Sequence, residues 1–221
     1  MDLQSTFRNY LRQQNLLYGN ELYFSRYLKN SDTDNQKSTN ILEEYRIAVC
    51  HCKKCPLGDS RTNFVFGSGD SNANLLVIGE APNKQEDLLG SPFVGRAGKL
   101  LDDIFRAIDK KRDRGVYITN ILKCKPPNSR DPLPSEVDKC EPYLLEQIKK
   151  IQPKLILALG RVTGKILLKT DVPLKEMREK THNYNGTPLR VTYHPASLLR
   201  NPDFKKLAWV DFQWIRDYLK D

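Results

Sequence analysis

Four short apolar segments, separated by stretches with helical periodicity, constrain the fold of this chain more than any other feature. The segments are 75–79 (LLVIG), 116–122 (VYITNIL), 155–159 (LILAL) and 189–193 (LRVTY). The first and third are apolar almost throughout, as expected for strands that are buried on both faces. Helical patterns cover residues 99–110, 135–150, 162–169 and 203–219. Strands that alternate with helices predict an α/β fold with a parallel sheet and helices on both faces.

The region before the first strand has a different organisation. The chain has 221 residues, which suits one α/β domain with an N-terminal appendage. Residues 3–28 have helical spacing, residues 30–40 are polar and predict a loop or linker, and residues 41–49 predict a short helix. We therefore divide the chain into an N-terminal helical extension with its linker, residues 1–45, and a domain of residues 46–221.

The composition indicates a soluble, globular protein. Hydrophobic residues make up 39% of the chain and charged residues 29%. No apolar run approaches the roughly 18 residues that a membrane span needs. The first residues, MDLQSTFRNYLRQQ, lack the basic and then apolar pattern of a signal peptide. We expect an intracellular, cytoplasmic protein that does not associate with a membrane.

Positive charge is concentrated in the second half of the chain. Residues 106–221 carry 24 Lys and Arg against 14 Asp and Glu, a net charge of +10. Residues 1–105 carry 12 against 13, a net charge of −1. A basic region of this kind favours a polyanionic partner, most often a nucleic acid, although a basic surface also occurs without one.

Polar residues stand at the carboxyl ends of the four predicted strands, after the first, third and fourth and inside the end of the second. They are Gly79-Glu80-Ala81, Thr119-Asn120, Gly160-Arg161 and His194-Pro195. In an open α/β sheet, ligands bind beyond the carboxyl ends of the strands. A carboxylate, an amide, a guanidinium and an imidazole would therefore share one edge. Each residue alone is weak support for a site, because a single histidine after a strand is more often structural; the four together favour one.

Four of the five cysteines have a spacing that suggests a metal centre. Cys52 and Cys55 form a close pair, while Cys124 and Cys140 lie far along the chain. Four thiolates can hold a zinc ion or a 4Fe-4S cluster. Zinc ribbons usually use two close pairs, so the spacing ranks iron–sulfur ahead of zinc. Unrelated buried cysteines are the simpler alternative, and the neighbouring Cys50 or His51 could replace a ligand.

The segment between Cys124 and Cys140 is rich in proline and has no core of its own. A metal centre at both ends would hold it still and present Lys125, Asn128 and Arg130 on its surface. A rigid basic loop is suited to binding a phosphate backbone. The alternative is a surface loop shaped by proline alone.

Several separated motifs carry a resemblance to a known family. They are GEAPNKQEDLLGSPFVGRAGKLLDDIF, YITNILKCKPPNSRDPLPSEVDKCEPYL, LALGRVTG and HPASLLR. Together they resemble the family 4 uracil-DNA glycosylases, which are iron–sulfur enzymes, from about Cys52 to the C-terminus. The resemblance implies a three-layer α-β-α sandwich around a short, mainly parallel, four-stranded sheet, with a 4Fe-4S cluster as cofactor. It also implies hydrolysis of the N-glycosidic bond of deoxyuridine flipped out of DNA, which leaves an abasic site.

The resemblance assigns roles to three residues around the base. His194 would donate a hydrogen bond to uracil O2, where negative charge develops as the base leaves. Asn120 offers the acceptor and donor that complement uracil N3–H and O4, and this pattern rejects cytosine. Phe93 would stack on the flipped base.

The first motif contributes Glu80, which we expect to position or deprotonate the attacking water. Gly79 and Ala81, on either side of it, would line the pocket with backbone. Asn83 is a departure, because the motif usually ends there in glycine. Asparagine tolerates left-handed backbone angles, so we expect the turn to survive. The inserted loop of the related cross-linking branch is absent, so we expect turnover.

Other residues would contact DNA beyond the flipped nucleotide. Leu198 and Leu199 could fill the gap left in the base stack. Arg161, Lys165 and Arg200 could hold phosphates, although each one singly is equally well explained as solvated surface charge.

Two further functions compete with the glycosylase. One is a non-catalytic DNA-binding or polymerase-associated module that retains the fold and cluster; the presence of Glu80, Asn120 and His194 disfavours it. The other is a zinc-stabilised nucleotide-binding domain. No GxxxxGK[ST] sequence occurs, which disfavours a common ATPase. We expect a monomer whose partner is uracil-containing DNA, and an N-terminal extension that could recruit a replication or repair protein.

Overall fold

The computed structural model describes residues 33–220, and side chains from residue 41 onward. The predicted helix over residues 3–28 lies outside the described residues. The strands are β1 (Ser68–Gly69), β2 (Leu75–Gly79), β3 (Val116–Asn120), β4 (Leu155–Leu159), β5 (His182–Tyr184) and β6 (Thr187–Thr192). The helices are α2 (Thr33–Val49), α3 (Leu57–Ser60), α4 (Lys84–Leu89), α5 (Gly95–Ala107), α6 (Pro134–Ile151), α7 (Arg161–Leu168), α8 (Leu174–Met177), α9 (Pro195–Arg200) and α10 (Phe204–Tyr218), with a 3-10 turn η1 (Pro127–Ser129).

One six-stranded sheet forms the middle of the fold, in the order β1-β3-β2-β4-β6-β5. The inner strands β3, β2, β4 and β6 are parallel, as predicted. The edge strands β1 and β5 pair antiparallel with their neighbours. The predicted sheet of four strands was therefore too small. Strands of two and three residues contain no apolar run, so the sequence pattern did not reveal them.

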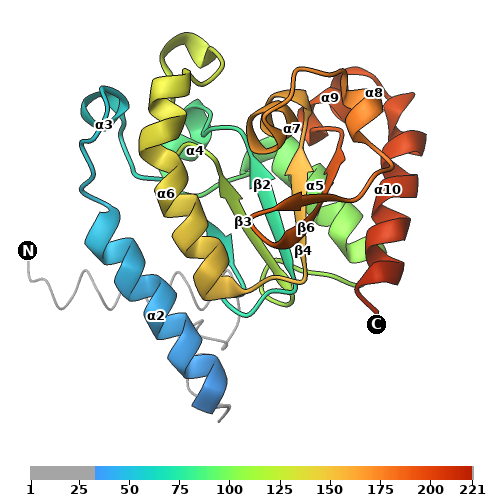
Figure 1. The fold of residues 1–221 in the computed structure, drawn as a ribbon, viewed down its shortest axis with the longest axis horizontal. Helices are drawn as coiled ribbons and strands as arrows, with labels where there is room; N and C mark the ends of the chain where they lie inside the picture. The colour runs from blue at the N-terminus through green and yellow to red at the C-terminus, as the bar shows by residue number, and fades with distance from the viewer. Residues whose placement is uncertain (1–32, 221) are drawn as a thin grey trace, which may run out of the picture. The chain divides into compact units, whose positions relative to one another are not determined.

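Helices cover both faces of the sheet, which gives the predicted three layers (Figure 1). One face packs against α2, α6 and α7 through residues such as Leu42, Leu144 and Leu167. The other face packs against α5 and α10 through Phe105 and Phe212, whose rings meet edge to face at 6.2 Å. Every residue of β2 and β4 is buried, which explains their continuous apolar sequences.

The strand order places a crevice between two central strands. The chain leaves β2 for β3 on one side and later returns to β4 on the other side of β2. Such a reversal opens a crevice beyond the carboxyl ends of the strands, where ligands bind in α/β sheets. We call this end of the sheet the carboxyl edge; the ends of β2, β3, β4 and β6 all lie along it.

The helix before the cysteines is longer than predicted. Helix α2 begins at Thr33, so the predicted loop over 30–40 is wrong for residues 33–40. No glycine or proline interrupts these residues, and a helix anchored by Leu42 in the core can extend back through them. The predicted boundary between residues 45 and 46 stays a prediction. Within residues 33–220, no helix is both long and apolar enough to cross a membrane.

Candidate active site and cysteine centre

Backbone pairing beyond the strand ends builds the floor of the site. The amide of Ile121 donates to the carbonyl of Gly79 at 2.9 Å, and that of Leu122 to the carbonyl of Glu80 at 3.0 Å. A Cβ atom on Gly79 would overlap Oδ1 of Asn120 and lie 2.7 Å from Cε2 of Phe93. Glycine is therefore required at position 79, because the Asn120 side chain and the Phe93 ring pass directly over its backbone.

Phe93 is held in a left-handed backbone conformation, with φ of 52°. Its amide donates to Oε1 of Glu86 at 3.0 Å, and its carbonyl accepts from Nη2 of Arg112 at 2.6 Å. A bulky residue adopts positive φ only where its surroundings impose it. Glu86 and Arg112 impose it here. Sequence reasoning missed both, although Asn83 and Glu86 have the spacing of a capping box.

Asn83 has a different role from the one that its sequence position suggested. Its φ is −83°, so it does not occupy a left-handed turn. It is the N-cap of α4, and its Oδ1 accepts from the amides of Gln85 at 2.8 Å and Glu86 at 3.0 Å. Glu86 completes the capping box by accepting from the amide of Asn83. The departure from glycine therefore supplies a helix cap.

Asn120 ends strand β3 with its side chain buried, at 1% exposure. Its Nδ2 has no hydrogen-bond partner within the described part of the chain. An unpaired buried donor is costly, and it is characteristic of a site that a ligand completes. The carbonyl of Asn120 accepts from Nζ of Lys123 at 2.7 Å, a contact that sequence reasoning also missed.

His194 lies close to the Phe93 ring, with ring centroids 5.3 Å apart. Its Nδ1 accepts from the amide of Ala196 at 3.1 Å, so a neutral ring carries its proton on Nε2. Burial, with a smaller effect from Arg200, lowers the pKa of His194 to about 4. The ring is therefore a neutral Nε2–H donor near pH 7. Gly160, with φ of 92°, approaches its Cβ.

Glu80 lies at the end of β2 and is half-buried. Burial, and then the charge of Asp131, raises its pKa to about 7. A carboxyl with this pKa accepts and releases a proton near neutral pH, which suits a general base. A carboxylate, an amide, an aromatic ring and a neutral imidazole therefore lie along the carboxyl edge.

The cysteine centre lies on the α2–α6 face of the sheet. The four cysteines singled out by their spacing, Cys52, Cys55, Cys124 and Cys140, line one cavity. Cys50 does not line it; its thiol donates to the carbonyl of Ile47. All five cysteines are free of disulfides. Within residues 33–220, no group of three or more His, Cys, Asp or Glu side chains is arranged to hold a single metal ion.

Donor groups surround the sulfur atoms of this centre. Arg61 Nη1 donates to Sγ of Cys124 at 3.2 Å, and the amide of Lys123 donates to Sγ of Cys140 at 3.3 Å. Burial raises the pKa of the Cys140 thiol to about 11. Deprotonation of such a thiol needs positive charge nearby, which a metal ligated by the sulfur provides.

The segment after Cys124 is held by more than its cysteines. Arg130 makes two hydrogen bonds to the Glu136 carboxylate, at 2.8 and 2.5 Å, and Glu136 also accepts from the amide of Leu133. The charge of Arg130 is therefore already paired, which weakens its predicted role in phosphate binding. Lys125 has no carboxylate partner among its hydrogen bonds and ion pairs in the described residues.

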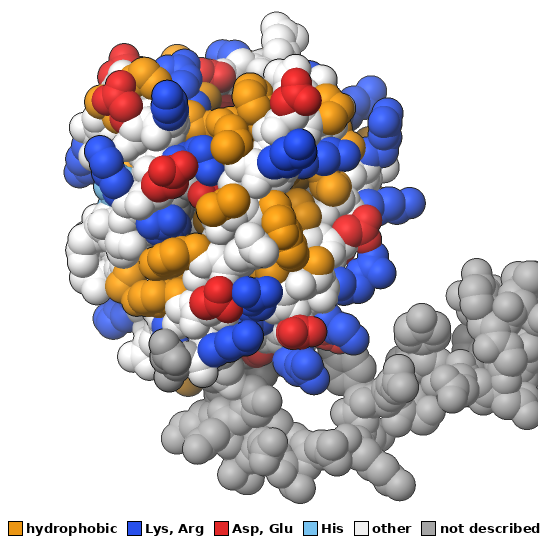
Figure 2. Space-filling model, turned by 90° about the vertical axis from the view of Figure 1, so that its right-hand side faces the viewer, with side chains coloured by type: hydrophobic (Ala, Val, Ile, Leu, Met, Phe, Trp, Pro, Cys, Tyr) orange, Lys and Arg blue, Asp and Glu red, His pale blue; other side chains and the backbone are white. Residues whose placement is uncertain are grey.

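The predicted DNA-contacting residues differ in exposure. Leu198 is only 1% exposed, which disfavours the wedge role predicted for it; that role stays a prediction. Leu199 is 37% exposed, and Arg200 is exposed beside it. Figure 2, which faces the α10 side, shows Lys and Arg side chains spread between hydrophobic ones.

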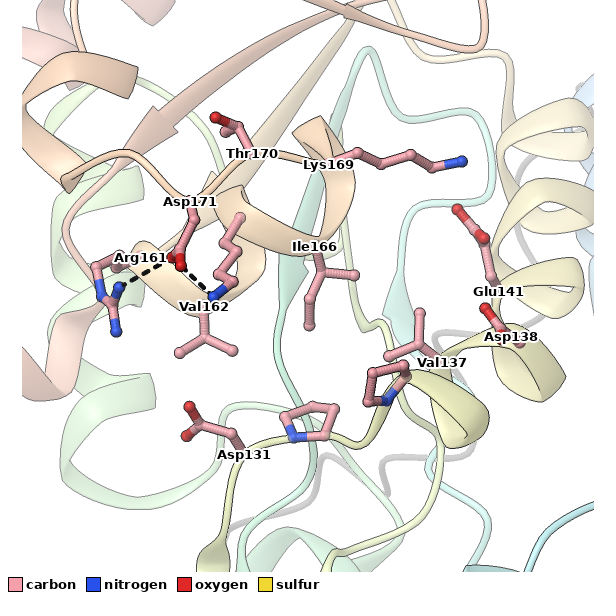
Figure 3. A pocket seen from close by; sticks show the side chains of 13 residues that line it. Asp131, Val137, Asp138, Glu141, Arg161, Val162, Ile166, Lys169, Thr170 and Asp171 are labelled. Carbon is pink, nitrogen blue, oxygen red and sulfur yellow. Dashed lines mark ion pairs between the residues drawn. The ribbon is translucent and has the colours of Figure 1, made fainter.

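A cavity of about 640 Å³ lies between the start of α6 and helix α7 (Figure 3). Arg161 and Lys165 both face Asp171 there, at 3.7 and 2.7 Å. Their charges are partly neutralised by this pairing. Asp131, which acts on Glu80, also lines the cavity, but Asn120, Phe93 and His194 do not.

Comparisons with known proteins agree with this geometry. Residues 66–214 match the model of the uracil DNA glycosylase superfamily. The chain is similar to the type-4 uracil-DNA glycosylase of Archaeoglobus fulgidus, with 39% identity covering 79% of this chain and 91% of that protein. It is also similar to the type-4 enzymes of Sulfurisphaera tokodaii and Saccharolobus solfataricus. Each is 42% identical, and the alignments cover 80% and 77% of this chain and 84% and 83% of those proteins.

Proposed function

The chain belongs to the uracil-DNA glycosylase superfamily and, within it, to the type-4 enzymes, and on this premise we propose that it excises uracil from DNA. It hydrolyses the N-glycosidic bond of a deoxyuridine that has been flipped out of the base stack, and it leaves an abasic site. The reaction begins base excision repair. The observation that carries the proposal is the unpaired amide of Asn120 beside the Phe93 ring.

Base recognition rests on Asn120 and Phe93. The free Nδ2 of Asn120 donates to uracil O4, and Oδ1 accepts from N3–H. Cytosine presents the reverse pattern and would leave both groups mismatched in a buried site, which is strongly unfavourable. Glu86 and Arg112 fix the backbone of Phe93. The Phe93 ring stacks on the face of the base.

Bond cleavage depends on His194 and Glu80. The Nε2–H of His194 donates to uracil O2, and this hydrogen bond strengthens as the departing base becomes anionic. A neutral donor remains in place throughout, because the pKa of His194 is about 4. Glu80, with a pKa of about 7, orients the water and takes its proton as the sugar cation forms.

DNA binding places the exposed Leu199 in the gap that the flipped base leaves. Arg200 and Lys125 contact phosphates. Arg161 does so only if its ion pair with Asp171 breaks. Residues 1–45 as a recruiting extension, a monomeric state and a cytoplasmic location stay predictions.

The cysteine centre holds a 4Fe-4S cluster in this proposal. Four thiols that line one cavity suit such a cluster, and one close pair with two distant cysteines fits the spacing of a zinc ribbon poorly. Cys52, Cys55, Cys124 and Cys140 would hold the cluster, which would cross-link the segment before α3, the chain after β3 and helix α6. Its role would be structural, because hydrolysis requires no electron transfer. Arg61 and the Lys123 amide orient the sulfur atoms.

The experiment is cleavage of a labelled single-stranded oligonucleotide with one uracil, followed by alkali. We expect scission at uracil by the wild type and its near-complete loss in His194→Ala, with DNA affinity retained. His182→Ala is the matched control, because the hydrogen bond of that ring within residues 33–220 goes to the Met177 carbonyl and the residue lies on the edge strand β5. A wild type that binds DNA without scission would favour the non-catalytic module.

A further inference from the structure

We propose that Lys123 is a positioning residue that couples the cysteine centre to uracil recognition by Asn120. The inference rests on the proposed function, because it concerns the same cluster and the same base-recognising amide. It assigns to one buried side chain two tasks: balancing the negative charge of the ligated sulfurs and fixing the end of β3. Neither task belongs to the residues that recognise the base or cleave the bond.

The Lys123 side chain is completely buried and fully hydrogen-bonded. Its Nζ lies 2.6 Å from Oγ1 of Thr119, 2.7 Å from the carbonyl of Asn120 and 2.6 Å from Oε1 of Gln147. The Thr119 hydroxyl itself donates to the carbonyl of Phe66, so it must accept from Lys123. Three acceptors within hydrogen-bond distance match the three hydrogens of the ammonium form. Burial lowers the pKa of Lys123 to about 7, and the charges of Cys140 and Cys124 oppose that lowering.

A buried ammonium needs a compensating negative charge. Within the described residues, no carboxylate is among the hydrogen-bond or ion-pair partners of Lys123. Its immediate neighbour in sequence is Cys124, and its own amide donates to Sγ of Cys140 at 3.3 Å. In this proposal the thiolates of Cys124 and Cys140 that would hold the cluster supply the counter-charge, while Lys123 itself holds the Asn120 carbonyl.

The coupling works through the backbone of β3. Nζ of Lys123 donates hydrogen bonds to the Asn120 carbonyl and the Thr119 hydroxyl. Thr119 and Asn120 are the last two residues of the strand. The Gln147 side chain ties this group to α6, about two turns beyond Cys140. A shift of Lys123 would therefore move the Asn120 amide away from the base. Misplacement by a fraction of an ångström is enough to weaken a buried hydrogen bond.

The test uses full-length protein with Lys123→Met, which keeps the length of the side chain without its charge. The first measurement is loss of visible absorbance and of iron per chain during challenge with a chelator. The second is the ratio of affinities for uracil-containing and cytosine-containing oligonucleotides, measured in a His194→Ala background so that no base is removed. The control is Lys149→Met, which removes the charge of an exposed lysine on α6, outside the buried network and outside the residues proposed to contact DNA.

We expect Lys123→Met to lose iron faster and to lower the affinity ratio, each by about tenfold, as expected when a buried charged partner is removed. Lys149→Met should leave both unchanged. A purely structural role would reduce the folded fraction and leave the affinity ratio of the folded protein intact. Wild-type behaviour of Lys123→Met in either measurement would overturn the coupling.

Thr119→Val covers the case in which Lys123→Met does not fold. It removes one acceptor but keeps the ammonium beside the sulfurs, so we expect a lower affinity ratio with iron retained. An unchanged ratio would overturn the proposal. In the His194→Ala background alone, absence of any preference for uracil would instead count against the proposed function, so the two failures are distinguishable.

Discussion

Glu80 and His194 have pKa values displaced in opposite directions, and burial is the main cause for both. Burial disfavours the charged form, which is the anion of Glu80 and the cation of His194. One buried edge therefore gives a base that titrates near neutral pH and a donor that stays neutral. Proton removal from water needs the ionisable carboxyl of Glu80, and the hydrogen bond to uracil O2 needs the neutral imidazole of His194.

Of the two catalytic groups, only Glu80 should contribute to the pH dependence of excision near neutral pH. Glu80 acts as the anion, so log(kcat/KM) should rise with pH and level off above about pH 7. His194, with a pKa of about 4, should add no second limb between about pH 5 and about pH 9. Single-turnover excision across this range checks it, and Glu80→Gln should flatten the profile. A rise that persists in Glu80→Gln would assign it to another group.

Two arginines with different surroundings should contribute differently to DNA binding. Arg130 is paired with Glu136, whereas Arg200 is exposed next to Leu199. Each phosphate contact contributes about one unit to the slope of log Kd against log salt. Arg200→Gln should therefore reduce the slope by about one, and Arg130→Gln should leave it nearly unchanged. Fluorescence anisotropy over a salt series measures both. An equal reduction in the two variants would mean that Arg130 leaves Glu136 on binding.

At the scale of elements, helix α4 connects the first motif to the aromatic ring. Its N-cap Asn83 and its Glu86 form a capping box, and Glu86 also holds the Phe93 amide. Asn83→Ala should lower the free energy of unfolding by about 1 kcal/mol, because it removes the side-chain acceptor. Asn83→Gly should cost only a few tenths, roughly, since glycine is a tolerable N-cap.

Urea unfolding of the two Asn83 variants beside the wild type measures this difference. Equal destabilisation by alanine and glycine would contradict the capping role. Excision of uracil should remain close to wild type in Asn83→Gly, because the backbone at this position does not need positive φ.

The cysteine centre joins elements that the sheet alone does not connect. Removal of iron by a chelator should lower the unfolding temperature and increase amide exchange in residues 50–60 and 124–133. Strands β2 and β4 should keep their protection, since their residues are fully buried in the sheet. Mass spectrometry of hydrogen exchange checks this. Unchanged exchange in residues 50–60 would mean that the cluster does not hold this segment.

At the scale of the whole molecule, the sequence predicted the strands that are buried on both faces of the sheet. Strands β2 and β4 begin and end where their apolar runs do, and the sandwich follows from their alternation with helices. The edge strands β1 and β5 were not predictable, because they are short and take their conformation from a neighbour. The extent of α2 was missed because a polar helix gives little periodic signal.

Within the candidate site, residues in motifs were predictable, and the contacts that orient them were not. Glu80, Asn120, His194 and Phe93 were named from the sequence. Lys123 was not, because nothing local distinguishes a buried lysine from a basic loop residue; its burial depends on Gln147, 24 positions away. The burial of Leu198 likewise depends on the packing of α9.

The most direct test of uracil excision is to measure the free base released from DNA with one uracil. Wild type would be run beside Asn120→Ala and the control Asn74→Ala, whose exposed side chain lies before the start of β2. We predict free uracil and an abasic site with wild type and Asn74→Ala, and at least about a hundredfold slower release with Asn120→Ala. Release at the wild-type rate by Asn120→Ala, or no release by any of the three, would contradict recognition of uracil by this site.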